Sequence, residues 1–162
     1  MSLSAGDKLP NATLRLMGTE GPEERTIVEI TKGRKVVIFG LPGAYTRTCS
    51  AAHVPSFIRT KDQFDAKGVD EVICVSVNDV FVMQSWGEDT GATQAGITML
   101  ADPAAEFTKA IDMLFTAEPV GLIDRSKRYA LLAEDGVVTV YQAETGTGVC
   151  TVSSGEELLA AI

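Results

Sequence analysis

The stretch VVIFGLPGAYTRTCSAAHVPSF, residues 36–57, decides the fold. It opens with four consecutive apolar residues, which predicts a short strand covered on both faces of a sheet. A loop that contains Pro42 and Gly43 follows, and from Cys49 to about residue 67 the apolar residues take a helical spacing. The order is therefore strand, loop and helix, with Cys49 where the helix begins.

The same order continues along the chain. Residues 71–77 predict a second buried strand, and residues 97–102 predict a further strand. Between them, Asn78 or Asp79 is the expected N-cap of a helix. Asp102 and Pro103 then predict the cap and first residue of another helix.

Both ends of the chain predict antiparallel structure. Extended patterns over residues 12–16 and 25–30 flank a Gly- and Pro-containing turn, which indicates an N-terminal β-hairpin. Residues 128–144 predict a second hairpin, and Ser153 with Glu156 forms a capping box for a terminal helix. The expected fold is α/β, a mixed central β-sheet flanked by helices on both faces, in one domain over residues 1–162.

Composition narrows the range of partners. The chain has 162 residues, a formal charge of -8 and a pI near 4.6, which argue against binding nucleic acid or an anionic membrane surface. Its first ten residues lack the basic and apolar regions of a secretion signal, and no apolar run reaches the ~20 residues of a membrane helix. We therefore expect a cytoplasmic protein.

The three cysteines are Cys49, Cys74 and Cys150. An odd number in a reducing compartment makes structural disulfides unexpected. The chain has no C-x-x-C pair and a single histidine, His53, so a metal site is not expected either.

Cys49 is the candidate reactive group. At the first turn of a helix, unpaired backbone N–H groups and the helix dipole favour a thiolate, and a loop at the carboxyl end of a strand is a place where ligands reach a sheet. Thr46 places a hydroxyl three residues earlier, within reach of the sulfur or of a small oxygen ligand. The alternative is a buried cysteine that acts as a small apolar residue, which is our interpretation of Cys74.

Pro42, Thr46 and Cys49 match the P-x-x-x-T-x-x-C signature of peroxiredoxins. The longer match PGAYTRTCSAAHVPSF resembles the type II, atypical branch of that family, which is also the peroxiredoxin-5-like branch, and the similarity extends over nearly the whole chain. The resemblance implies a thioredoxin-like fold and thiol-dependent reduction of hydrogen peroxide and organic hydroperoxides. It implies no metal and no bound organic cofactor.

The resemblance also assigns roles to residues. It implies that Cys49 is the peroxidatic cysteine, that Thr46 orients the peroxide, that Pro42 shields the site and that Arg128 is the distant arginine. A cation beside the sulfur stabilises its negative charge and the charge that develops during attack on peroxide. Its neighbours Arg125 and Lys127 are expected to be surface charges.

One residue departs from the family pattern. Arg47 stands where the family commonly has a second proline after the threonine. A flexible cation at this position alters loop stiffness or the local potential, but it removes no reacting group.

Turnover needs a second thiol. Cys150 lies among glycines and is a candidate resolving cysteine, and Cys74 is the other, because some type II relatives use a cysteine in this strand. The third possibility is that neither resolves and that glutathione with glutaredoxin attacks Cys49 directly. Family analogy ranks glutathione or glutaredoxin first and thioredoxin second as reductant.

The resemblance further implies a homodimer formed through loops near the active site, with His53 and Trp86 as candidate interface residues. Trp86 with Phe81 and Met83 is otherwise expected to pack in the core.

The reactive cysteine is also compatible with other functional classes. A cysteine hydrolase could pair Cys49 with His53, which lies four residues later on the same helix face, but such a base normally comes from another element. A disulfide reductase would need C-x-x-C, and residue 46 is a threonine. A redox sensor that uses the same reactive cysteine is the alternative to the enzyme.

Overall fold

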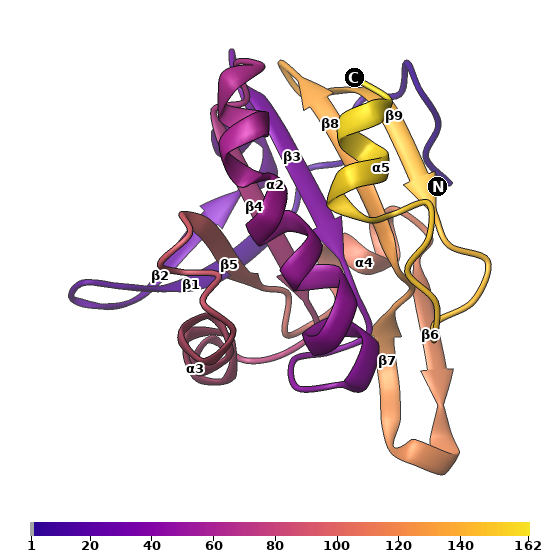
Figure 1. The fold of residues 1–162 in the computed structure, drawn as a ribbon. Helices are drawn as coiled ribbons and strands as arrows, with labels where there is room; N and C mark the ends of the chain where they lie inside the picture. The colour runs from indigo at the N-terminus through magenta and orange to yellow at the C-terminus, as the bar shows by residue number, and fades with distance from the viewer. Residues whose placement is uncertain (1) are drawn as a thin grey trace.

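A seven-stranded mixed sheet forms the centre of the molecule, and a separate two-stranded ribbon projects from one end (Figure 1). The computed structural model describes residues 2–162. The strands are β1 (Thr13–Gly18), β2 (Gly21–Thr26), β3 (Lys35–Gly40), β4 (Glu71–Ser76), β5 (Ile97–Ala101), β6 (Leu114–Ala117), β7 (Leu122–Ser126), β8 (Tyr129–Glu134) and β9 (Val137–Ala143). The helices are α1 (Ile27–Thr31), the π turn η1 (Cys49–His53), α2 (Val54–Ala66), α3 (Val80–Thr90), α4 (Glu106–Ala110), the 3₁₀ turn η2 (Glu118–Val120) and α5 (Gly155–Ala160).

The strand order in the large sheet is β2-β1-β5-β4-β3-β8-β9. Strands β5, β4 and β3 are parallel, whereas β8 pairs antiparallel with β3, so the sheet is mixed as predicted. In the register of that last pair, Gly40 at the end of β3 lies opposite Tyr129 at the start of β8. The antiparallel pairing therefore brings residue 128 beside the loop that follows β3.

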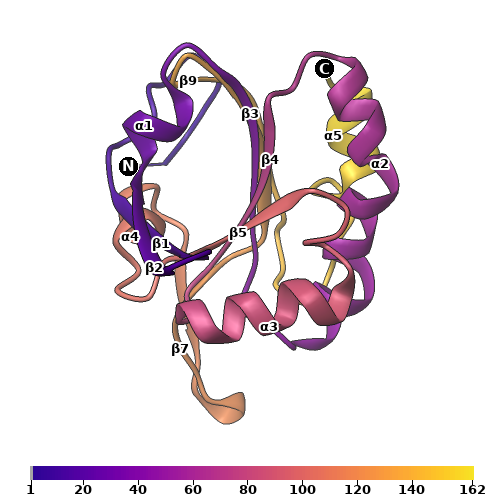
Figure 2. The same ribbon diagram turned by 90° about the vertical axis from the view of Figure 1, so that its left-hand side faces the viewer.

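Helices cover both faces of the sheet. Figure 2 shows the sheet edge-on, with α2, α3 and α5 on one side and α1 and α4 on the other. Side chains of β3 alternate between the two cores, since Val37 and Phe39 pack with α2 and α3 while Val36 and Ile38 pack with α1 and α4. The strand is buried on both faces, as its continuous apolar run predicts.

The predicted N-terminal hairpin is confirmed as β1 and β2, but its second half is shorter than expected. Residues 27–31 form helix α1 instead of extending the strand. Thr26 begins the helix by a reciprocal cap, because its hydroxyl accepts from the Glu29 N–H and the Glu29 carboxylate accepts from the Thr26 N–H. Ile27 and Ile30 are then buried three residues apart, on one helix face.

Two predicted helix starts are shifted. Helix α4 begins at Glu106, so Pro103 lies outside it, although the Asp102 carboxylate still accepts from the N–H groups of Phe107 and Thr108. The terminal helix is capped by Ser154, whose hydroxyl accepts from the Glu157 N–H, so the predicted box of Ser153 with Glu156 is wrong.

The ribbon of β6 and β7 is not predicted from the sequence. Its residues are mostly exposed or half-buried, so the segment carries no strong apolar alternation. By contrast, the hairpin of β8 and β9 and the Asp79 cap of α3 are confirmed.

Candidate active site

Cys49 is the first residue of the π turn that leads into α2. The N–H of Val54 donates to the Cys49 carbonyl across this wider turn, a local feature that recurs at functional sites. The side chain is fully buried within the core between the sheet and α2, α3 and α5. This differs from the accessible thiol that the loop position predicts, because the Arg128 side chain lies against the sulfur and is itself held by the Thr147 carbonyl.

Arg128 makes the contact that defines the site. Its Nη2 donates to Cys49 Sγ over 3.2 Å and to the Thr147 carbonyl over 3.1 Å. Its Nη1 lies 3.0 Å from His53 Nδ1, and the side chain is 1% exposed. The contact places the positively charged guanidinium directly against Sγ.

His53 is neutral in this setting. Burial and the neighbouring Arg128 charge lower the pKa of His53 to about 3, against the opposing effect of the Ser153 carbonyl. No hydrogen bond joins its ring to Cys49 among the contacts of residues 2–162, so the two residues do not form a nucleophile–base pair.

A cavity of about 410 Å³ is lined in part by Pro42, Thr46, Arg47 and Arg128, the residue whose Nη2 contacts Cys49 Sγ. Thr46 donates its hydroxyl hydrogen to the Gly43 carbonyl over 2.7 Å, which leaves the oxygen lone pairs free to accept a hydrogen bond from a ligand. Thr46 makes no direct hydrogen bond to Cys49 among the contacts of residues 2–162. Arg47 is exposed at the cavity rim.

Arg125 takes a position that the sequence reasoning missed. It is half-buried, and its Nη1 lies 3.4 Å from the Pro42 carbonyl, so it supports the site loop and is not simply a surface charge. Lys127 is exposed, as predicted. The sequence signal for Arg125 is weak because it follows an exposed aspartate on the unpredicted strand β7.

Tyr45 fixes the same loop from its outer side. Its backbone has φ 65°, in the left-handed region that non-glycine residues seldom adopt. The hydroxyl compensates by contacts with α3, since it lies 2.8 Å from Ser85 Oγ and donates to the Asp89 carboxylate over 2.7 Å.

All three cysteines are free thiols, in different environments. Cys74 is fully buried in β4, and burial and the Cys49 charge raise its pKa well above the ordinary value despite the opposing effect of Arg128. Cys150 is half-buried. Burial raises its pKa, although Ser153 and Arg128 oppose the rise.

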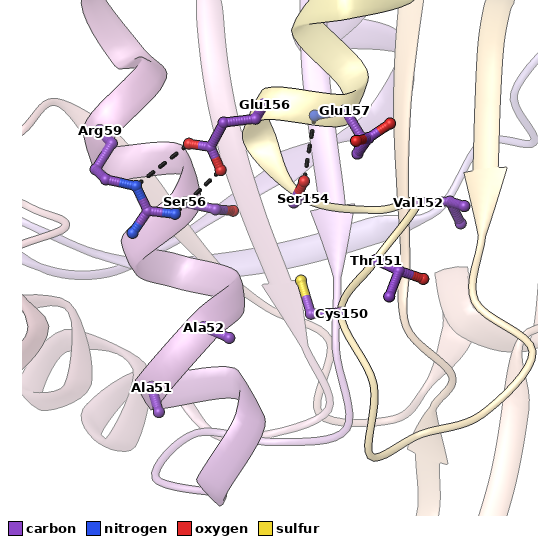
Figure 3. A pocket seen from close by; sticks show the side chains of 10 residues that line it. All are labelled: Ala51, Ala52, Ser56, Arg59, Cys150, Thr151, Val152, Ser154, Glu156 and Glu157. Atoms are coloured by element: carbon purple, nitrogen blue, oxygen red, sulfur yellow. Dashed lines mark hydrogen bonds and ion pairs between the residues drawn. The ribbon is translucent and has the colours of Figure 1, made fainter.

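A second cavity, of about 670 Å³, has Cys150 in its wall. Figure 3 shows Ala51, Ala52 and Arg59 of the η1–α2 segment on one side of it and the Cys150 segment on the other. Arg59 pairs with Glu156 over 3.0 Å across the top of this cavity. The Cys150 thiol therefore borders open space on the same side of the sheet as Cys49.

No helix within residues 2–162 combines the length and apolar character needed to cross a membrane. Within the same residues, no three His, Cys, Asp or Glu side chains gather in a way that could hold a metal ion.

The redoxin family model matches residues 4–159. The chain is 47% identical to the chloroplastic peroxiredoxin-2E-2 of rice over 99% of this chain and 73% of the relative. It is 39% identical to peroxiredoxin-2B of Arabidopsis thaliana over 99% of this chain and 98% of the relative. Among solved structures, reduced Prx3 of Vibrio vulnificus in complex with hydrogen peroxide superposes with a TM-score of 0.91, at 45% identity and 98% coverage of each chain.

The chain is a peroxiredoxin of the redoxin family. As a peroxiredoxin it is a thiol-dependent peroxidase that acts on hydroperoxides with electrons from a thiol reductant. Its thioredoxin-like fold, a mixed sheet flanked by helices, is the predicted one. Peroxiredoxin 5 of Alvinella pompejana has the same fold, with 27% identity and a TM-score of 0.85 over 98% of this chain and 97% of that chain.

Two residues of this peroxiredoxin that were predicted for a subunit interface lie elsewhere. His53 and Trp86 are both fully buried, so neither side chain is on the surface. Trp86 belongs to the core, as its alternative interpretation predicts, and its Nε1 donates to Ser50 Oγ over 3.0 Å. Phe81 is 66% exposed, in contrast to the core position expected for it.

Proposed function

We propose that Cys49 is the peroxidatic cysteine and that it passes through a sulfenic acid. The contact of Arg128 Nη2 with Cys49 Sγ, at 3.2 Å, carries the proposal. The thiolate attacks the oxygen of the hydroperoxide that carries hydrogen, and the O–O bond breaks. The other oxygen leaves as hydroxide or alkoxide and takes a proton from solvent water to give water or alcohol. The attacked oxygen stays on sulfur as Cys49–SOH.

The proposed roles of the neighbouring residues follow from the cavity that they line. The Thr46 hydroxyl oxygen accepts a hydrogen bond from the peroxide O–H through its free lone pairs, and Arg128 donates toward the sulfur and the oxygen under attack. Pro42 is buried at the same wall and limits water there. Hydrogen peroxide bound in the Vibrio vulnificus relative supports this use of the site.

The sulfenic acid then reacts with a thiol to give a disulfide and water, and a second thiol releases Cys49. The half-buried position of Cys150 beside a cavity supports it over the fully buried Cys74 as an internal resolving thiol. For the external reductant we keep glutathione with glutaredoxin ahead of thioredoxin, as the family resemblance ranks them.

We also propose that the protein is a homodimer. The exposed side chains of Tyr45 and Phe81 support this, because both lie against or on α3 near the site loop. A cytoplasmic location stays a prediction, and relatives named chloroplastic occupy another compartment.

The test follows hydrogen peroxide loss with glutathione and glutaredoxin, and separately with thioredoxin, for the parent, Cys49→Ser, Cys74→Ser and Cys150→Ser. We expect Cys49→Ser alone to abolish turnover with every reductant that supports the parent. Full activity of Cys49→Ser would overturn the assignment. If the parent is oxidised once by hydrogen peroxide and no reductant supports turnover, the redox sensor is favoured. Mass spectrometry of the oxidised parent distinguishes an internal disulfide from a glutathione adduct.

A further inference from the structure

His53 is the single histidine of the chain, and its ring is fully buried behind Arg128. Nδ1 lies 3.0 Å from Arg128 Nη1, and Nε2 lies 2.9 Å from the Ser153 carbonyl oxygen. The ring also lies against Phe39 and Phe57, with centroid distances of 5.0 and 5.7 Å. Two polar and two aromatic contacts therefore fix the orientation of the imidazole.

These partners determine where the ring proton is. A guanidinium has donors and no acceptor, so Nδ1 must accept from Arg128. A carbonyl oxygen has no proton to give, so Nε2 must donate to Ser153. Both contacts are satisfied only by the neutral ring protonated at Nε2, in agreement with the lowered pKa of His53.

The ring nitrogen matters to Arg128 because the guanidinium has few other partners. Nη2 is shared between Cys49 and the Thr147 carbonyl, and Nε has no hydrogen-bond partner within residues 2–162. His53 supplies the acceptor for Nη1. Without it, two of the three guanidinium nitrogens would lack an acceptor, and the planar group would be free to turn away from the sulfur.

The neutrality of this acceptor is equally important. A carboxylate in its place would pair with the guanidinium and offset its charge, whereas a neutral imidazole leaves the full positive charge facing the sulfur. Arg128 is the charged group that contacts the imidazole directly. Glu144 is connected to the ring only through Ser153, whose carbonyl faces His53 Nε2 and whose N–H and hydroxyl donate to the Glu144 carboxylate.

We propose that His53 is a positioning residue, which holds the Arg128 guanidinium against Cys49 through a neutral Nδ1 acceptor. The proposal rests on the proposed role of Cys49. It also connects the site to the Cys150 segment, because Ser153 joins the ring to Glu144, whose carboxylate accepts four hydrogen bonds from Thr151 and Ser153.

A matched pair of variants tests the acceptor. Asn and Leu have nearly the same size and shape, and His53→Asn keeps a neutral acceptor near the Nδ1 position whereas His53→Leu removes it. We expect His53→Leu to react with hydrogen peroxide about tenfold more slowly at neutral pH, with its pH profile moved to higher pH, and His53→Asn to stay within about threefold of the parent. The fluorescence of the single tryptophan, Trp86, reports the reaction, because its indole donates to Ser50 beside Cys49.

The proposal would be overturned if His53→Leu kept the parent's rate with hydrogen peroxide and its pH profile. It would also be overturned if both variants lost the same amount of rate while having equal midpoints of unfolding. If His53→Leu does not fold, a measurement on the parent decides. Nitrogen-15 spectra of selectively labelled protein contain one imidazole, and we expect a neutral ring protonated at Nε2 from about pH 5 to 8. A ring protonated at Nδ1, or an imidazolium in that range, would overturn the proposal, even if Cys49 proves not to be the peroxidatic residue.

Discussion

Arg128 follows Cys49 by 79 positions in the chain, and its Nη2 lies 3.2 Å from Cys49 Sγ. The antiparallel pairing of β8 with β3 produces this proximity, since Tyr129 lies opposite Gly40. The buried cation and the buried sulfur thus come from two segments that the sheet joins at one end. Their separation in the chain makes the electrostatics of the site dependent on correct strand register.

Replacement of Arg128 by lysine tests the geometry of this contact. A lysine keeps the charge but lacks the planar fork that reaches Cys49, Thr147 and His53 together. We expect Arg128→Lys to lower the second-order rate constant with hydrogen peroxide by roughly a hundredfold, measured by stopped flow. Lys127→Met is the control, because it removes an exposed charge one residue away, and an equal loss there would show that net charge alone matters.

Thr46 tests hydrogen bonding to the substrate. Valine has the shape of threonine without the hydroxyl, so Thr46→Val removes both the bond to the Gly43 carbonyl and the free lone pairs. We expect roughly a hundredfold loss in the rate constant with hydrogen peroxide, and near-parent activity in Thr46→Ser. Parent-like kinetics of Thr46→Val would remove the hydroxyl from the mechanism.

Glu144 fastens the segment that carries Cys150. Its carboxylate accepts from the N–H and hydroxyl groups of both Thr151 and Ser153, which follow Cys150 closely in the chain. We expect Glu144→Gln to raise the rate of Cys150 alkylation in the reduced protein by about tenfold at neutral pH, because local opening becomes easier. Glu156→Gln, which alters a carboxylate of the same cavity that pairs with Arg59, should leave the rate unchanged.

The same carboxylate gives a pH dependence. Burial raises the pKa of Glu144, but the hydrogen bonds from Ser153 and Thr151 outweigh burial, so the pKa in the fold is lower than its ordinary value. A group with a lowered pKa contributes stability above its unfolded pKa of about 4.3, and the contribution disappears as the pH falls through the folded value. The parent should therefore have a higher free energy of unfolding than Glu144→Gln at pH 7, and this difference should disappear in acid. A difference that grows in acid would contradict the assigned contacts.

Phe81 tests the proposed homodimer. It is 66% exposed on α3, four residues before Ser85, the residue that Tyr45 contacts. A buried, unpaired carboxylate opposes association, so we expect Phe81→Asp to change a dimeric elution and light-scattering mass to a monomeric one. Val28→Asp, a comparable change on the opposite face of the sheet, should keep the parent mass. A parent protein that is already a monomer would disprove the homodimer.

Local patterns predicted the elements that carry the site. The apolar run of β3, the Asp79 cap and the hairpin of β8 and β9 each depend on interactions within a few residues or one turn, which a sequence displays directly. The errors arose where two local solutions compete. At Thr26 a reciprocal cap overrides a β-branched pattern, and at Ser153 a nearby carboxylate takes the serine that would have capped α5.

The sequence by itself determined that a cysteine begins a helix after the loop that follows a buried strand, and that Pro42 and Thr46 precede it at the spacing of a peroxiredoxin. The tertiary structure alone decided that this sulfur is buried, that Arg128 donates to it and that His53 lies behind Arg128 as a neutral acceptor. The physical reason is range: backbone hydrogen bonds and turn geometry act between near neighbours, whereas these contacts depend on which strands pair, in which register, and on what the loops between them cover.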